Sequence, residues 1–281
     1  MAGHVIEVLG VVVLVLGTLV SVLAAWGIVD FPTPLARMHA ATKPASLGLA
    51  VTVLGAAIAA TEADLAAIGV LVAGGLFLTA PITGHLLGRA AYLAGQTPGL
   101  VHDDLAGTVL EPMGSSKPMA RSGVSLVRIA VLTAFWVLLW GDPALGTALA
   151  GLAVAAVLEV LVWRRVGISD VAVSPIGILR FLVRYVGLVI ASTARVAWEV
   201  ITPSNELREA IVGVPLRVTG EPAVVLLANA ITYTPGTLTI EVVDGRLYVH
   251  VLHFEDVETT IAEVRRIEAL VLAALPGPVR D

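Results

Sequence analysis

Residues 224–251, VVLLANAITYTPGTLTIEVVDGRLYVHV, hold the clearest turn and strand pattern of this chain. Thr234-Pro235-Gly236-Thr237 places proline where a turn needs a fixed φ and glycine where it needs a positive φ, so it should end a helix and begin a strand. Asp244-Gly245 is a strong signal for a two-residue hairpin. Because apolar and polar side chains alternate on both sides of Asp244-Gly245, the stretch predicts half of a small sheet.

The alternation also assigns the side chains of this hairpin to faces. On the first strand, Leu238, Ile240 and Val242 share one face. On the return strand Tyr248 and His250 point away from the apolar side chains. A lone histidine on a strand is more often hydrogen-bonded locally than catalytic, so we expect His250 at the surface or between subunits, in a structural role. The apolar alternation of the return strand is carried by Leu247, Val249 and Val251.

Around the hairpin the sequence predicts a small α+β domain. Its first strand is the alternating run 212–218, and a helix over 222–231 precedes the hairpin. The last helix begins after Asp256, an acceptable N-cap, and repeats apolar residues at helical spacing. The predicted order is therefore β-α-β-β-α. Nothing in it resembles a phosphate-binding glycine loop, a zinc-ligand spacing or a basic nucleic-acid surface, so we expect no cofactor, metal, nucleic acid or independent catalytic site.

The whole chain has the composition of a membrane protein. It is 57% hydrophobic and only 14% charged, with a mean hydropathy of +0.93, whereas soluble domains are about a quarter charged. The absence of cysteine excludes disulfides, thiolate catalysis and iron–sulfur ligation by this chain. A helix needs roughly 20 apolar residues to cross the hydrocarbon core. Candidate spans are residues 5–26, 45–60, 65–87, 125–140 and 145–163.

Basic residues gather in alternate connections between these spans. The connections at 61–64 and 141–144 contain neither arginine nor lysine. The positive-inside rule therefore places the N-terminus outside and the C-terminal domain in the cytoplasm. The basic residues on the cytoplasmic side are then Arg37, Lys43, Arg89, Arg121, Arg128 and Arg164-Arg165.

Residues 175–201 are apolar but carry charge along one side. Arg180, Arg184, Arg195 and Glu199 fall within an arc of about 100° on a helical projection. Burying three unpaired arginines in lipid would be costly, so we favour an interfacial helix, with a sixth span as the alternative. The predicted fold class is a membrane α-helical protein with three plus two transmembrane helices, one interfacial amphipathic helix and a small cytoplasmic α+β domain.

Two separate stretches carry a resemblance to one family. LLANAITYTPGTLTIEV and LYVHVL resemble the E subunit of the Mrp (Mnh/Pha) multi-subunit sodium/proton antiporters, over about residue 124 to the end. Residues 27–48, GIVDFPTPLARMHAATKPASLG, resemble the G-subunit signature G-x-x-x-F-P-x-x-x-x-R-x-H-A-x-T-K. Residues 81–92, PITGHLLGRAAY, resemble the C-terminal end of the G subunit. The resemblance implies a fusion. Its parts are a G-subunit-like membrane domain (1–91), a cytoplasmic linker (92–123), an E-subunit-like membrane part with the interfacial helix (124–203) and a cytoplasmic domain (204–281).

This resemblance implies an accessory subunit of a sodium/proton antiporter in a prokaryotic cell membrane. The subunit would complete the membrane sector and the assembly of the complex, and sodium and protons would be the transported ions. Its partners would be membrane lipid and the other Mrp-type subunits, including the large proton-channel subunits. Two alternatives stay open. One is an equivalent subunit of an Mrp-related respiratory or hydrogenase complex, and the other is a membrane-anchored module that binds a small ligand.

The G-like signature contains the strongest candidate for an ion path or a pH sensor. His39 titrates near physiological pH, and fixed cations at Arg37 and Lys43 would favour its neutral form. This arrangement suits a pH sensor or a proton relay, or else the two cations only set the topology. The family often has Asp directly after Phe-Pro, where this chain has Thr33. Any role of that carboxylate would have to fall to Asp30.

Two residues inside the predicted spans are further candidates. Glu159 lies one turn before Trp163-Arg164-Arg165 and either forms a local ion pair or faces a water-filled path. Pro81 either kinks the third span and frees a carbonyl, or only shapes the packing around Gly84 and Gly88. The E-like motif at Thr234, Pro235, Gly236, Thr237 and His250 is expected to serve assembly or structure. Because few ionisable residues lie in the spans, we expect that this chain does not translocate ions alone.

Overall fold

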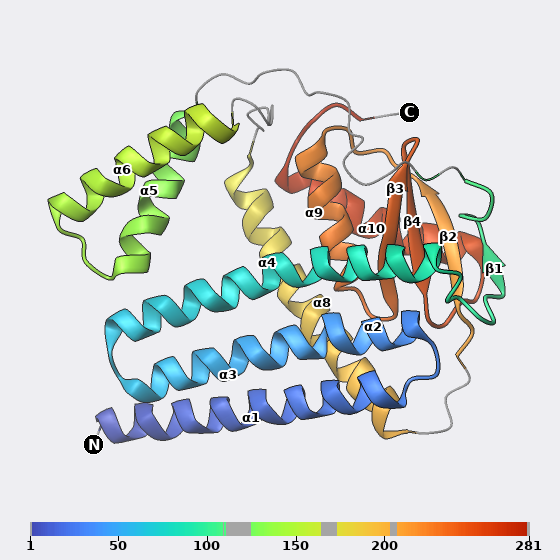
Figure 1. Ribbon diagram of the computed structural model, residues 1–281, viewed down its shortest axis with the longest axis horizontal. Helices are drawn as coiled ribbons and strands as arrows, with labels where there is room; N and C mark the ends of the chain where they lie inside the picture. Colours follow the sequence, from blue (N-terminus) through green and yellow to red (C-terminus); the bar gives the residue numbers. More distant parts are fainter. Residues whose placement is uncertain (1, 109, 111–124, 164–172, 203–206, 280–281) are drawn as a thin grey trace.

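The structure, a computed structural model, describes residues 2–108, 110, 125–163, 173–202 and 207–279. It is mostly helical, with several helices apolar enough for a membrane and one small sheet. Long helices extend to one side, and the sheet lies at their opposite end (Figure 1). The domain boundary predicted near residue 123 and the pair Arg164-Arg165 fall outside the described residues.

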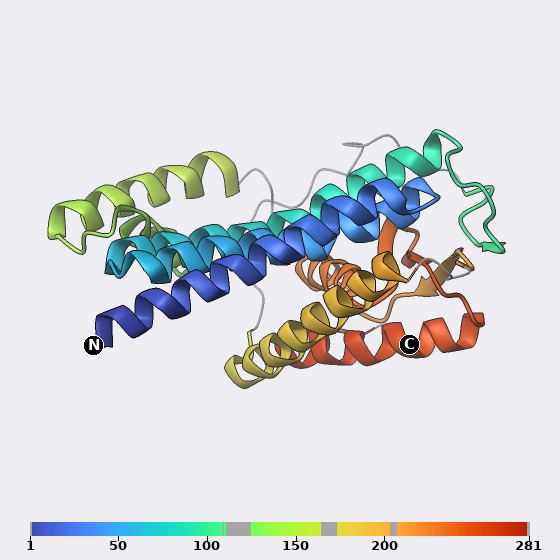
Figure 2. The same cartoon turned by 90° about the horizontal axis from the view of Figure 1, so that it is seen from below.

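Three long helices, α1 (Ala2–Asp30), α3 (Pro44–Ala60) and α4 (Ala63–Leu93), lie side by side (Figures 1 and 2). Glycines let α1 and α3 approach closely, since a Cβ on Gly55 would lie 2.2 Å from the backbone nitrogen of Leu14. In α4 the Cβ positions of Gly74 and Gly75 have no atom within 4 Å. Close helix packing therefore explains Gly55 but not these two glycines.

A short helix, α2 (Pro34–Thr42), links α1 to α3 and was not predicted from the sequence. The hydroxyl of Thr33 caps it by accepting a hydrogen bond from the Ala36 N–H at 3.0 Å, and Pro34 occupies the first turn. Lys43 separates α2 from α3. We call α1 to α4 the four-helix unit.

Two shorter apolar helices form a hairpin. These are α5 (Leu126–Trp140) and α6 (Leu145–Leu158), and a π-helical turn, η1 (Glu159–Trp163), extends α6. Gly141 ends α5 with a φ of +65°, a conformation that glycine adopts without strain. Among the described residues, four helical segments are long and apolar enough to cross a membrane, and this hairpin is not one of them. They are residues 3–30, 34–59, 64–93 and 175–201.

The helix over 175–201, α8 (Pro175–Ile201), forms as the sequence predicts and lies against the last helix, α10 (Val257–Ala274). Their contact is close at Gly177, where a Cβ would lie 1.9 Å from the carbonyl oxygen of Ala273. Asp256 caps α10, accepting a hydrogen bond from the Thr259 N–H at 2.7 Å. Hydrogen bonds from the Thr259 backbone and hydroxyl hold the pKa of Asp256 below its usual range.

The sheet has the order β1-β2-β4-β3. Strands β2 (Ala210–Pro215), β3 (Thr237–Val243) and β4 (Arg246–Val251) pair antiparallel, while β1 (His102–Asp103), from the predicted linker, pairs parallel with β2. Helix α9 (Glu221–Thr232) connects β2 to β3. We call residues 207–279 the sheet domain.

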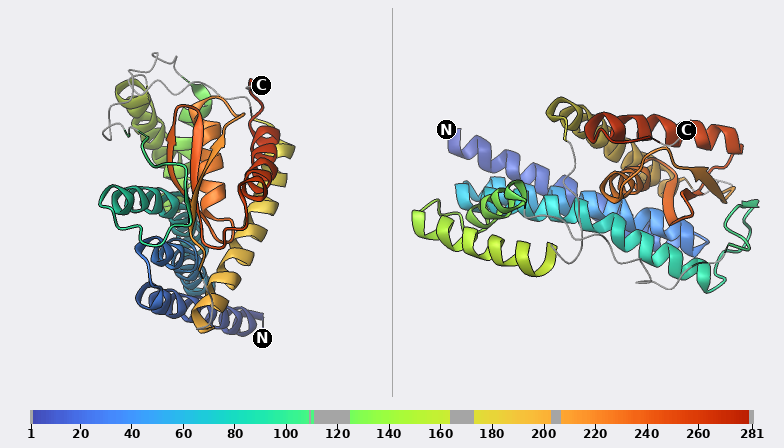
Figure 3. Two further views of the ribbon diagram at one scale, coloured as in Figure 1. Left: turned by 90° about the vertical axis from the view of Figure 1, so that its right-hand side faces the viewer. Right: turned by 90° about the horizontal axis from the view of Figure 1, so that it is seen from above.

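Both faces of the sheet are buried, which corrects the expected placement of the hairpin side chains. One face packs on α8, α9 and α10, and the other packs on α2 and α4 (Figure 3). Because Leu238 pairs with His250 and Thr239 with Val249, Leu238 lies on the face opposite Val249. After the bulge between Thr239 and Glu241, Val242 pairs with Leu247, so Val242 does not share the face of Leu238 as the alternation predicted. His250 is therefore fully buried against the four-helix unit, and not at the surface.

Candidate functional site

A row of buried polar side chains begins at the junction of α2 and α3. His39 on α2 and Lys43 at its C-terminal end are four residues apart, so they lie on one face of the helix. The Lys43 ammonium nitrogen is 2.7 Å from His39 Nδ1, and it donates a second hydrogen bond to the carbonyl oxygen of Thr237 at 2.7 Å. Both side chains are fully buried. The G-like signature thereby meets the E-like turn directly.

The row continues across the interface into the sheet. His39 Nε2 lies 3.1 Å from His250 Nδ1, with the two rings tilted by 56°. On its other side, His250 Nε2 lies 2.9 Å from the carboxylate of Glu209, which directly precedes β2. Lys43, His39, His250 and Glu209 thus form an unbroken buried series, which we call the Lys43–Glu209 chain.

Thr33 completes the chain at the Glu209 end. Its hydroxyl lies 2.7 Å and 2.9 Å from the two carboxylate oxygens, and the same oxygen caps α2. Where the family often has Asp, a hydroxyl here contacts a carboxylate supplied by the other half of the chain. Asp30, expected as a substitute for that Asp, is exposed at the end of α1.

The hydrogen bonds of the Lys43–Glu209 chain all run in one direction, from Lys43 as donor to Glu209 as acceptor. An ammonium group only donates hydrogen bonds, and a carboxylate only accepts them. With Lys43 charged and Glu209 ionised, both His39 and His250 must therefore accept on Nδ1 and donate from Nε2. The result is a buried cation and a buried anion joined through two neutral imidazoles. A buried charge needs such partners, because leaving one unpaired costs several kcal/mol.

Further polar contacts join the four-helix unit to the sheet domain. Ser46 Oγ lies 3.2 Å from the hydroxyl of Tyr233, and burial raises the pKa of Tyr233 to about 12. Other links are the hydrogen bond of His85 with Thr232 at 2.6 Å and the ion pair of Arg89 with Glu241 at 2.9 Å.

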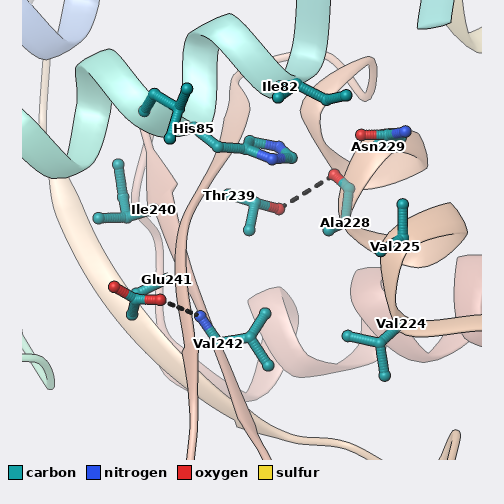
Figure 4. Close-up of a pocket in the computed structure, with 11 residues that line it drawn as sticks. Ile82, His85, Val224, Val225, Ala228, Asn229, Thr239, Ile240, Glu241 and Val242 are labelled. Atoms are coloured by element: carbon teal, nitrogen blue, oxygen red, sulfur yellow. Dashed lines mark hydrogen bonds between the residues drawn. The ribbon is translucent and has the colours of Figure 1, made fainter. Parts of the chain in front are cut away.

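A cavity of about 430 Å³ lies beside these links, between α4, α9 and β3. Figure 4 shows His85 on the α4 side, with Asn229 and Thr239 facing it from the sheet domain. Ile82, Val225 and Ile240 are among its apolar lining residues.

A second polar pair lies where α8 meets the end of β4. Glu199 Oε1 is 2.8 Å from His253 Nε2, and the Glu199 side chain is only 4% exposed while that of His253 is 34% exposed. The other Glu199 oxygen, Oε2, is buried and has no hydrogen-bond partner in the described part of the chain. The pair borders a cavity of about 400 Å³, together with Arg195 and Trp198.

Two of the predicted candidates, Arg37 and Pro81, are not part of the Lys43–Glu209 chain. Arg37 is exposed and donates from Nε to the carbonyl oxygen of Phe31 at 2.7 Å, so Lys43 alone is the cation hydrogen-bonded to His39. Pro81 is buried inside α4, and Gly84, one turn on, allows Thr42 of α2 to pack close.

Glu159 forms an ion pair with Arg128 of the neighbouring helix α5. Its carboxylate accepts hydrogen bonds from Arg128 Nη2 at 2.6 Å and Nε at 3.1 Å, and from the Ser125 N–H at 2.8 Å. The pair closes the hairpin of α5 and α6. Arg164-Arg165, where a partner was expected, lies outside the described residues.

The E-like turn has a clear local structure. Gly236 has a φ of +71°, which is the positive value that the sequence predicts. Thr237 is buried, and its hydroxyl donates to the carbonyl oxygen of Ile231 at 2.6 Å. This bond fixes the turn that presents the Thr237 carbonyl to Lys43.

Glu209 is the member of the Lys43–Glu209 chain that the sequence reasoning missed. Its only signal is a charge immediately before an alternating apolar run, and its partners are distant in sequence. Within the described ranges, no group of three or more His, Asp or Glu side chains is arranged to hold a metal ion.

Comparison with known proteins gives matches to both halves of the chain. A family model described as Na+/H+ ion antiporter subunit matches residues 129–274, and one described as Na+/H+ antiporter subunit matches residues 13–92. The putative antiporter subunit mnhG2 of Staphylococcus saprophyticus is 28% identical over 95 residues, which is 33% of this chain and 64% of that protein. The chain therefore spans less than two thirds of this relative.

Two proteins named as Na+/H+ antiporter subunits are also similar to separate parts of the chain. The G subunit of Alkalihalophilus pseudofirmus is 35% identical over 92 residues, covering 32% of this chain and 77% of that protein. The E subunit of Bacillus subtilis is 34% identical over 68 residues, covering 24% of this chain and 43% of that protein.

Proposed function

Because the chain belongs to the Na+/H+ antiporter subunit family, with a G-like N-terminal half and an E-like C-terminal half, we propose that it is an accessory subunit of a multi-subunit monovalent cation/proton antiporter. In this role it completes the membrane sector and holds the complex together. Sodium and protons are the exchanged ions, and larger subunits provide the main proton channels.

The observation that carries this proposal is the interface between the two halves. Residues of the G-like signature contact the E-like motif through the Lys43–Glu209 chain, which is almost completely buried. Separate subunits of one complex would need such an interface to recognise each other. Fusion makes the same interface permanent.

The arrangement of charge supports a defined orientation in a prokaryotic cell membrane. The N-terminus lies at one end of the long helices, and the sheet domain lies at the other (Figure 1). Arg89 forms an ion pair with Glu241 of the sheet domain, so it lies at that second end. By the positive-inside rule, the end with Arg89 and the sheet domain faces the cytoplasm, and the N-terminus faces outside.

Exposed apolar side chains support partners within the membrane. Leu16 and Leu19 on α1, Val131 on α5 and Leu149 on α6 are each about half exposed or more. Lipid and neighbouring antiporter subunits would cover such surfaces.

Sodium/proton exchange in everted vesicles from an antiporter-deficient strain tests the proposal. Three versions of the gene cluster are compared: complete, lacking this gene, and this gene alone. We expect exchange only from the complete cluster. Exchange that survives the deletion, or that arises from this chain alone, would overturn an essential accessory role.

A further inference from the structure

We propose that the Lys43–Glu209 chain is a proton relay between the four-helix unit and the sheet domain. Its physiological use rests on the function proposed above, whereas the proton transfer itself is a property of four groups within this chain. The relay assigns a role to Glu209 and adds a proton acceptor at the cytoplasmic end of the interface.

The geometry meets the requirement for direct transfer. Consecutive groups are 2.7, 3.1 and 2.9 Å apart, so each proton has a hydrogen bond along which to move. Every member is titratable, and histidine can take a proton on one nitrogen while releasing one from the other. A purely structural link needs only hydroxyls or amides, such as the bond between Ser46 and Tyr233 that joins the same two units.

One transfer event moves a proton across each of the three hydrogen bonds. The Lys43 ammonium gives a proton to His39 Nδ1, His39 gives its Nε2 proton to His250 Nδ1, and His250 gives its Nε2 proton to Glu209. Lys43 and Glu209 end neutral, and both imidazoles end as the Nδ1–H tautomer. The separated buried charges disappear in this state, and the reverse sequence restores them.

A second transfer in the same direction requires both imidazoles to return to the Nε2–H tautomer, because His39 with its proton on Nδ1 cannot accept another proton from Lys43 at that nitrogen.

The Glu209 end has its own contact for release. The Thr33 hydroxyl touches both carboxylate oxygens, and Thr33 is only partly buried. Thr33 therefore gives the Glu209 end of the relay a partly exposed contact beside the loop between α1 and α2.

Exchange by the assembled complex gives the first test. His39→Gln and His250→Gln keep a polar side chain but cannot relay protons, and Lys43→Arg keeps the cation but does not lose its proton at neutral pH. We expect each to lower the exchange rate about 100-fold, as expected for loss of a positioned proton transfer. His85→Gln is the matched control, because His85 is hydrogen-bonded at the same interface outside the relay. It should retain the rate within about two-fold. All variants are compared at equal amounts of co-purified complex.

Infrared difference spectroscopy after a pH drop gives a second test that does not depend on exchange. In the purified complex we expect the C=O band of a newly protonated carboxyl, which Glu209→Gln should remove. His250→Gln should abolish or delay that band. An unchanged band in His250→Gln would show that the proton reaches Glu209 by another route, and the relay would be wrong.

The two tests separate the relay from the function on which it rests. If the three variants exchange at the unaltered rate, the relay is overturned and the accessory role stands. If the unaltered complex does not exchange, the accessory role fails and the infrared result alone decides the relay. If the histidine variants do not assemble, the comparison of the unaltered complex with Glu209→Gln still decides, because the absence of a pH-dependent carboxyl band that Glu209→Gln removes would contradict proton arrival there.

Discussion

His39 and His250 are separated by 211 residues in the sequence, yet their ring nitrogens lie 3.1 Å apart. One residue belongs to the G-like half and the other to the E-like half. Their contact lies in the middle of the buried chain that starts at Lys43 and ends at Glu209 and Thr33. The interface between the two family units is therefore held together by groups that can carry charge.

The stability of the protein should depend on whether the side chain at position 33 keeps a hydroxyl. Thr33→Val removes the cap of α2 and one donor to Glu209, and these losses together should destabilise the protein by about 2 kcal/mol or more. Thr33→Ser retains both bonds and should behave like the unaltered protein. The apparent Tm of the purified complex checks this, and equal Tm values for the valine and serine variants would contradict it.

Thr33→Asp should instead make stability depend on pH. Aspartate can cap α2, but its carboxylate would lie against that of Glu209, and two adjacent carboxylates do not both ionise readily. The folded state of this variant therefore holds an extra proton that the unfolded state releases. Its Tm relative to the unaltered protein should rise as the pH falls from about 8 to about 5. If the difference in Tm between Thr33→Asp and the unaltered protein stays constant from about pH 8 to about pH 5, close contact between residue 33 and Glu209 would be excluded.

Local sequence signals predicted the parts of the fold that depend on neighbouring residues. The hairpin forms at Asp244-Gly245, where both residues have a positive φ, and Asp256 caps α10 as expected. Helix α8 begins after Ser174 and includes the whole predicted amphipathic stretch. Each of these features is decided within a few residues of chain, so the sequence carries enough information.

Features that depend on distant contacts could not be predicted in the same way. Nothing near Glu209 indicates that His250 and Thr33 will lie beside it. Strand β1 is only two residues long and forms because β2 is there to pair with it. His250 was expected at the surface or between subunits. Strand alternation alone could not decide between these positions, because it assumes one buried face, whereas α2 and α4 bury the second face as well.

Two glycines of α8 provide a matched test of its packing against α10. Gly177→Ala would place a Cβ 1.9 Å from a backbone oxygen, so the helices must move apart, at a cost of about 1–3 kcal/mol. Gly187 lies in the same helix with nothing within 4 Å, and Gly187→Ala should be neutral or stabilising by up to about 1 kcal/mol. Thermal unfolding of the two variants should give opposite or clearly unequal shifts. Equal shifts would mean that α8 and α10 are not in contact at Gly177.

Glu159 should be required for stability and not for ion movement. Its carboxylate is covered and accepts hydrogen bonds from Arg128 and from the Ser125 N–H, and losing a hydrogen bond to a charged group costs about 1.5–3 kcal/mol. Glu159→Leu should therefore lower the amount of assembled complex, while the double change with Arg128→Leu should recover part of it. The exchange rate per assembled complex should stay unaltered in both variants. Loss of exchange at normal assembly levels would instead place Glu159 on an ion path.

The position of α8 can be decided by cysteine labelling, because the chain contains no cysteine of its own. Val173 and Ile201 lie at the two ends of α8, and both are exposed. Three arginines on α8 make a lipid-spanning position costly, so we expect an interfacial helix with both ends on the cytoplasmic side. Val173→Cys and Ile201→Cys should then both react with a membrane-impermeant maleimide in everted vesicles, and neither should react in intact cells. Pro143→Cys and Glu255→Cys serve as references for the outer and cytoplasmic sides. Labelling of the two α8 positions from opposite sides would make α8 a membrane span, which its length and apolar composition also permit.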